Sequence, residues 1–166
     1  MGSGRGQAQR ALSLSLLRKK APLVWSDGTK EWHDEHGERH RAGAPALVHP
    51  DGEREWYQHG QLHRVGGPAQ DRPSGYKAWY QDGELHRDDG PAIVQPTGTL
   101  EWYVEGLRHR EDGPAVEYPS GDKMWWFRGE SLMEDAWKEK LEEKGLAKRL
   151  IVRHELISES LEKVTF

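Results

Sequence analysis

The sequence predicts a mainly β protein, a single-layer antiparallel meander of tandem β-hairpin repeats of about 23 residues with a C-terminal α-helical cap. Three observations predict this fold. A tryptophan recurs at spacings of 24, 23, 23 and 23 residues, glycines flank each of these tryptophans, and after Gly129 the repeat gives way to helical spacing. We therefore divide the 166 residues into a basic N-terminal tail or capping strand (1–20), five hairpin repeats (21–130) and a C-terminal helical segment (131–166).

The repeat unit reads P-x-G-x-x-x-W-Y-x-x-G-x-x-H-R-x-x-G-P-A-x-x-x, with matches at most positions over four copies, and we number the five copies by their tryptophans. These are Trp32, Trp56, Trp79, Trp102 and Trp125. The first four copies also carry a His-Arg pair, with the histidines His40, His63, His86 and His109. Agreement at so many positions indicates one structural unit that is stabilised by its stacked neighbours.

The residues at the two turns of the unit predict a β-hairpin. Pro-x-Gly suits a type I turn, and pairs such as Asp82-Gly83 suit two-residue hairpin turns with positive φ. Such a turn places Tyr80 opposite Leu85 and Trp79 opposite His86. The first copy has one extra residue, and we expect a three-residue loop at 35–37 to restore its register. The five tryptophans and four histidines then form a structural ladder.

Alternation along each strand puts the neighbouring aromatic residues on the opposite face. We predict that these residues bind a partner, because tyrosine combines an apolar ring with a polar tip. The candidate partner-binding residues are Tyr57, Tyr80, Tyr103 and Trp126, with His33 at this position in the first copy. Two alternatives stay open: the C-terminal helices cover this face, or it is the true core.

The His-Arg pairs are interpreted as scaffold. Equivalent histidines of neighbouring copies lie about 9–10 Å apart, too far to share one zinc ion, so we expect each to pack on its tryptophan and predict no metal site. The arginines offer a phosphate-binding row, but nearby acids such as Asp88 and Asp89 favour salt-bridged or solvated side chains.

The C-terminal segment has helical features. Ser131 to Glu134 has the form of a capping box, Trp137 and Leu141 follow at helical spacing, and Gly145 is a plausible stop. A second helical pattern occupies residues 146–164. We interpret the segment as a cap on the repeat stack, with a partner-binding or dimerising helix as the alternative.

Composition narrows the function classes. Hydrophobic residues make up 34 % of the chain, there are eight tryptophans and no cysteine, and the net charge is -4. Without cysteine there are no disulfides or thiolate sites, which is compatible with the cytoplasmic location we expect. The charge predicts no nucleic-acid partner, and membrane association is not expected. The basic residues 1–20 loosely fit a transit peptide, but a tail or strand is favoured.

The hairpin unit with a glycine on each side of an aromatic pair resembles the MORN-type repeat family, especially its bacterial antitoxin-like branch. The resemblance covers residues 24–130 and rests on Gly52-x-x-x-Trp56-Tyr57-x-x-Gly60 and its equivalents at 75–83, 98–106 and 121–129. It implies an elongated β-meander used for protein contacts. The His-Arg and Gly-Pro-Ala steps depart from that family and also fit a distinct repeat of similar design.

No motif indicates catalysis: there is no phosphate loop, nucleophile elbow or H-E-x-x-H. We therefore predict a non-catalytic scaffold, without a cofactor, that binds a protein partner in an inhibitor-, antitoxin- or adaptor-like role. The alternative is a small-ligand or glycan binder that uses aromatic grooves between hairpins.

Overall fold

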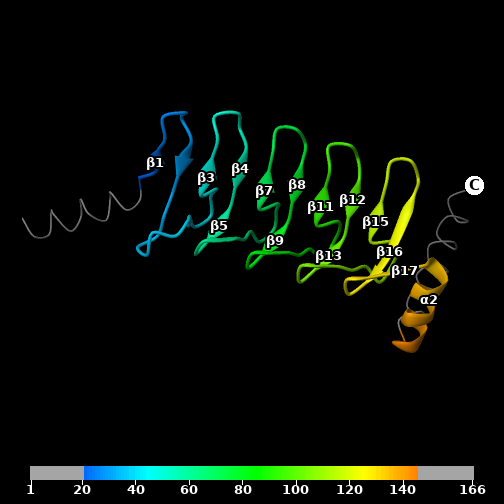
Figure 1. The fold of residues 1–166 in the computed structure, drawn as a ribbon. Helices are drawn as coiled ribbons and strands as arrows, with labels where there is room; N and C mark the ends of the chain where they lie inside the picture. Colours follow the sequence, from blue (N-terminus) through cyan, green and yellow to red (C-terminus); the bar gives the residue numbers. More distant parts are fainter. Residues whose placement is uncertain (1–20, 146–166) are drawn as a thin grey trace, which may run out of the picture.

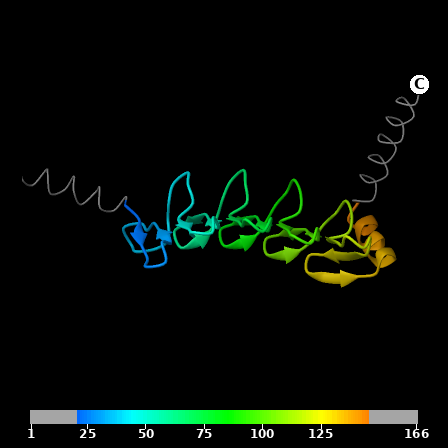
Figure 2. The ribbon, with the colours of Figure 1, turned by 90° about the horizontal axis from the view of Figure 1, so that it is seen from above.

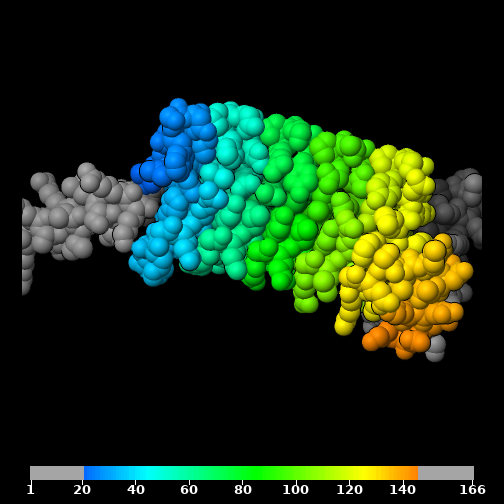
Figure 3. Space-filling view, viewed as in Figure 1, coloured from blue at the N-terminus to red at the C-terminus, as the bar shows by residue number. Residues whose placement is uncertain are grey.

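The computed structural model describes residues 21–145, which form five similar hairpin copies side by side in chain order, followed by one helix (Figure 1). The prediction of a mainly β meander with a C-terminal helix is confirmed. The copies stand in single file, so the described part is an elongated single layer (Figure 2). In the space-filling view each copy forms one band across the surface (Figure 3).

Most strands contain only two residues. The eleven strands of the long antiparallel sheet are, in order, β1 (Leu23–Val24), β2 (Lys30–Glu31), β3 (Leu47–Val48), β4 (Arg54–Glu55), β7 (Gln70–Asp71), β8 (Lys77–Ala78), β11 (Ile93–Val94), β12 (Leu100–Glu101), β15 (Val116–Glu117), β16 (Lys123–Phe127) and β17 (Glu130–Leu132). The three separate short hairpins are β5 (Tyr57–Gln58) with β6 (Gln61–Leu62), β9 (Tyr80–Gln81) with β10 (Glu84–Leu85), and β13 (Tyr103–Val104) with β14 (Leu107–Arg108).

The predicted register is correct. Tyr80 pairs with Leu85, and the His86 N–H donates to the Trp79 carbonyl at 3.1 Å. In the first copy the His40 N–H donates to the Trp32 carbonyl at 3.0 Å, so the longer loop restores the register there.

The two-residue turns have the expected backbone conformation. Asp82 and Gly83 have φ of 48° and 83°, as a type I′ turn requires. Three other turns place a non-glycine residue at the same positive φ, and these are His59, Glu105 and Arg128. Histidine tolerates this conformation better than most residues, whereas glutamate and arginine are uncommon in it, so the surrounding contacts must hold Glu105 and Arg128 there.

The Pro-x-Gly turns also form as expected. In the second copy the Gly52 N–H donates to the His49 carbonyl at 3.0 Å, which closes a four-residue turn around Pro50.

The core is a thin line along the array instead of a central mass. The alanines of the Pro-Ala pairs lie in the same row as the tryptophans, because the Trp56 N–H donates to the Ala69 carbonyl at 2.8 Å and equivalent bonds repeat along the array. Four of these alanines, Ala46, Ala69, Ala92 and Ala115, are 0 % exposed. Large and small side chains thus alternate across the sheet, so each methyl group is covered by its neighbours.

Helix α2 (Glu134–Glu143) packs against the last copy. Trp137 and Leu141 are buried with Phe127, and the Trp137 and Trp125 rings lie 4.5 Å apart between centroids. The helix ends as predicted, with Gly145 at a φ of 68°. The predicted capping box is wrong: Ser131 pairs with Trp126 inside β17, the cap residue is Met133, and no side chain caps the helix.

The N-terminal segment 1–20 and the second helical pattern after residue 145 lie outside the described residues. Among residues 21–145, no helix is long and apolar enough to cross a membrane.

Candidate partner-binding face

The sheet has two faces, which we name by their aromatic rows. The Trp face carries the five repeat tryptophans, and the Tyr face carries Tyr57, Tyr80, Tyr103 and Trp126. All of these side chains are partly exposed, so neither face is a closed core. Helix α2 contacts Trp125 and therefore packs on the Trp face at the last copy. The described helix leaves the Tyr face uncovered.

On the Trp face, an arginine lies over each of the first four tryptophans. The guanidinium carbon of Arg64 is 3.8 Å from the centre of the Trp56 ring, and the equivalent distances in the other copies are 3.8, 4.1 and 3.9 Å. The same guanidinium donates to the Pro68 carbonyl at 3.0 Å, and this bond recurs in all four copies. Arginine thus makes a favourable cation–π contact with the tryptophan, and the packing of histidine on the same ring stays a prediction.

The glycine of the Gly-Pro-Ala step makes room for this arginine. A Cβ at Gly67, Gly90 or Gly113 would lie 2.8, 3.0 or 2.9 Å from the guanidinium carbon of the preceding arginine. The first copy has Ala44 at this position, and its arginine–proline bond is the longest of the four, 3.3 Å.

Two of these four arginines are paired with carboxylates. Arg87 pairs with Asp89 at 2.7 Å, and Arg110 pairs with Asp112 at 2.8 Å and with Glu117 at 2.7 Å. With a ring on one side and a carbonyl or carboxylate at the donors, these guanidinium groups already have their partners.

The ladder histidines connect successive copies. The Nδ1 atom of His63 accepts the N–H of Asp82 at 3.1 Å, and Asp82 is the first residue of the next hairpin turn. The same bond joins His40 to His59, His86 to Glu105 and His109 to Arg128. The four residues that donate these N–H groups are the turn residues with positive φ, so the histidine of one copy holds the turn of the next in this conformation.

The Tyr face is built on buried carboxylates that the sequence analysis did not single out. The Tyr57 hydroxyl donates to Glu55 at 2.8 Å, and the Tyr103 hydroxyl donates to Glu101 at 3.1 Å. Both glutamates are only 8 % exposed. Burial and the neighbouring carboxylate of Glu55 raise the pKa of Tyr57 to about 12. Each hydroxyl is therefore committed to a buried acceptor.

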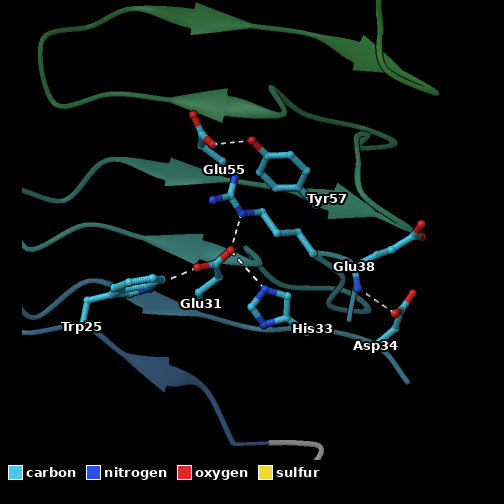
Figure 4. A network of polar contacts seen from close by, with 8 residues as sticks. Trp25, Glu31, His33, Asp34, Glu38, Glu55 and Tyr57 are labelled. Atoms are coloured by element: carbon cyan, nitrogen blue, oxygen red, sulfur yellow. Dashed lines mark hydrogen bonds and ion pairs between the residues drawn. The ribbon is translucent and has the colours of Figure 1, made fainter. Parts of the chain in front are cut away.

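The two ends of this face also carry arginine. In the first copy Glu31 accepts from Trp25 at 3.0 Å and contacts His33 and Arg39, as the network in Figure 4 shows for its labelled members. Burial opposes ionisation there, yet the hydrogen bonds from Arg39 and Trp25 lower the pKa of Glu31.

In the fourth copy Arg108 donates to Glu101 and to the Tyr103 hydroxyl, both at 2.8 Å. It also lies 5.2 Å from the centre of the Trp126 ring, whose buried Nε1 has no hydrogen-bond partner among the described residues. The C-terminal end of the face is therefore ordered by the same kind of arginine–glutamate pair as the first copy.

The third copy, in the middle of the face, differs. It has Ala78 where the second and fourth copies have glutamate, so within residues 21–145 the Tyr80 hydroxyl has no hydrogen-bond partner. Tyr76 adds a second tyrosine to this copy, with the Arg72 guanidinium 4.9 Å from its ring centre. Burial raises the pKa of both tyrosines, so both stay neutral and able to donate.

The structure therefore brings the predicted Tyr57, Tyr80, Tyr103 and Trp126 onto one face, but it does not make them equivalent. The residues that distinguish them are Glu55, Ala78 and Glu101, one position before each tryptophan. The sequence contains this difference. The residue before Trp-Tyr is glutamate in copies two and four but alanine in copy three.

The fold and the two faces define a tandem β-hairpin repeat protein with one scaffold face and one variable aromatic face. No protein-family model, curated protein or solved structure matches this chain. The MORN-type resemblance therefore stays a prediction.

Proposed function

We propose that this chain is a non-catalytic repeat scaffold that binds a protein partner through the Tyr face, in an inhibitor-, antitoxin- or adaptor-like role. The observation that carries the proposal is the centre of that face, where Tyr76 and Tyr80 present partly exposed rings and hydroxyls without a carboxylate beneath them. Tyrosine in the middle of a surface, with unused hydrogen-bonding capacity, is typical of the anchor residues of protein interfaces.

The charged residues around this centre support the same proposal. The arginine–glutamate pairs Arg39–Glu31 and Arg108–Glu101 lie in the first and fourth copies, so they flank the third copy on both sides. An apolar and aromatic centre with a polar border is the usual arrangement of a protein-binding surface. The Trp face lacks this arrangement, because arginines lie over four of its rings and α2 packs against the fifth.

The test compares two tyrosine variants of the full chain in a pull-down from native host lysate. The double variant Tyr76→Ser, Tyr80→Ser removes the central rings, and Val65→Ser, in the loop after Arg64, removes an exposed apolar side chain away from them as a control. We expect the wild type and Val65→Ser to capture the same protein, and the double variant to lose it. Far-UV circular dichroism and urea unfolding confirm that all three proteins are folded.

Photo-crosslinking then places the contact. A benzophenone amino acid at position 80 should crosslink to the captured protein, whereas the same group at position 65 should not. Equal capture by the double variant, or crosslinks at position 65 alone, would contradict a Tyr-face interface.

A second candidate is a small-ligand or glycan binder. One observation favours it: a groove of about 990 Å³ on the Trp face between the last copies, lined by Trp102, Val104 and Leu107 together with the acids of the 88–89 and 111–112 loops. Thermal unfolding with neutral sugars at millimolar concentration tests it. This candidate requires a rise in Tm that the exposed lining variant Glu111→Ala reduces.

A further inference from the structure

The junction between the first and second copies brings together two imidazoles and a carboxylate. Asp34, His40 and His59 each offer one ligand atom, and these atoms all lie within 4.8 Å of one another. The His59 Nδ1 atom lies 2.9 Å from the Asp34 carboxylate, and the two imidazole rings are 4.4 Å apart between centroids. Histidines at equivalent positions of neighbouring copies are too far apart to share an ion. His40 and His59 are closer because they are not equivalent: His40 belongs to the ladder and His59 to a hairpin turn.

This combination occurs at one junction among the described copies. The position of Asp34 is occupied in the next three copies by Gln58, Gln81 and Val104. The position of His59 is occupied by Asp82, Glu105 and Arg128. His40 has an equivalent in every junction and serves the scaffold, whereas Asp34 and His59 are additions specific to the first junction. The repeat itself does not require them.

The three-residue loop of the first copy holds the carboxylate in place. One oxygen of Asp34 accepts the N–H groups of His36 at 2.9 Å and Glu38 at 3.1 Å, which leaves the other oxygen facing His59. A carboxylate whose first oxygen is fixed by backbone donors loses little freedom when its second oxygen binds an ion. His59 itself is 60 % exposed, so an ion reaches it from solvent.

We propose that Asp34, His40 and His59 form a binding site for a divalent transition-metal ion of the zinc type. Two imidazole nitrogens and one carboxylate oxygen are ligands that such ions favour, with water completing a tetrahedral shell. The ion takes the place of the His59–Asp34 hydrogen bond, and the ring proton of neutral His59 moves to its Nε2 atom.

The geometry needs only small movements of side chains. Ligand atoms around zinc lie about 3.4 Å apart, given bonds of about 2.0–2.1 Å, so rotation of the exposed His59 ring closes the set. The bond from the His59 N–H to the His40 Nδ1 atom is 3.3 Å, the longest of the four such bonds, and is the easiest for the ion to replace. The bound ion then links copies one and two at the end of the array away from α2.

Isothermal titration of the full chain with zinc chloride tests the site. We expect one zinc ion per chain in the wild type and at least tenfold weaker binding in His59→Asn and in Asp34→Asn. Asparagine suits the positive φ of residue 59 and is a poor zinc ligand, so His59→Asn removes the ligand without disturbing the turn. His36→Ala is the matched control, because this exposed histidine lies in the same loop outside the cluster, and its binding should equal that of the wild type.

Cobalt(II) gives a second readout. The visible absorption of a tetrahedral cobalt complex should appear in the wild type and in His36→Ala and be lost in both site variants. A wild type that binds no stoichiometric zinc, site variants that bind as tightly as the wild type, or equal loss in His36→Ala would each overturn the proposal. A folded far-UV spectrum of His59→Asn without metal excludes unfolding as the cause of lost binding.

Discussion

The two faces of the sheet differ in how closely the copies resemble one another: the contacts on the Trp face recur from copy to copy, whereas the residues on the Tyr face vary. On the Trp face each of the first four copies makes the same set of contacts: arginine over tryptophan, arginine to the proline carbonyl, and histidine to the next turn. On the Tyr face the same backbone position carries histidine, tyrosine or tryptophan, and the residue beneath it is glutamate, alanine or methionine. Contacts made in every copy hold the copies together, whereas residues that vary between copies give each copy its own surface.

Single substitutions in the third copy should therefore separate stability from binding, and the largest effect belongs to the Trp face. We expect Trp79→Ala to lower the free energy of unfolding by about 3 kcal/mol, because it removes the ring under Arg87 and exposes the buried alanines beside it. Tyr80→Ala should lower it by about 1 kcal/mol, because a partly exposed ring without a hydrogen bond is lost. Urea unfolding at equilibrium measures both values, and equal losses would show that the faces do not differ as we describe.

The close approach of glycine to arginine should give the next largest effect. Gly90→Ala places a Cβ 3.0 Å from the Arg87 guanidinium carbon, and we expect a loss of about 1 kcal/mol as the end of this flexible side chain shifts over the tryptophan ring. A double-mutant cycle supplies the control: in an Arg87→Ala background the same Gly90→Ala change should cost almost nothing. A penalty that persists without the arginine would mean that the backbone, and not this contact, requires glycine.

Much of the scaffold was predictable because its determinants are local. Turn residues such as Asp82-Gly83 fix the hairpin, and the hairpin fixes the pairing of Tyr80 with Leu85. The prediction of a capping box at Ser131 was wrong, because it too relied on local sequence alone. A short local signature favours a helix there, but pairing of Ser131 with Trp126 extends the sheet through that residue.

The contacts between copies were not predictable from the pattern. Nothing in the spacing shows that His63 reaches the turn of the following copy 19 residues later, or that Gly83 donates to the Leu62 carbonyl of the copy before it. These contacts depend on how far one copy is displaced from the next. The pairing of Asp34 with His59, 25 residues apart, was missed because only the stacking of the copies brings them together.

The smallest effect tests the difference within the Tyr face itself. Tyr57→Phe removes the donor to the buried carboxylate of Glu55, and we expect it to cost about 1 kcal/mol in the free energy of unfolding. Tyr80→Phe removes a hydroxyl that has no partner among residues 21–145, so its effect on stability should stay within about 0.5 kcal/mol. The order reverses for partner binding, because of these two hydroxyls the one of Tyr80 has no partner within residues 21–145 and can bond across an interface. Urea unfolding and pull-down of the captured protein measure the two quantities on the same variants. If Tyr80→Phe were the more destabilising change, its hydroxyl would already be in use within the fold, and the centre of the Tyr face would be scaffold like the opposite side.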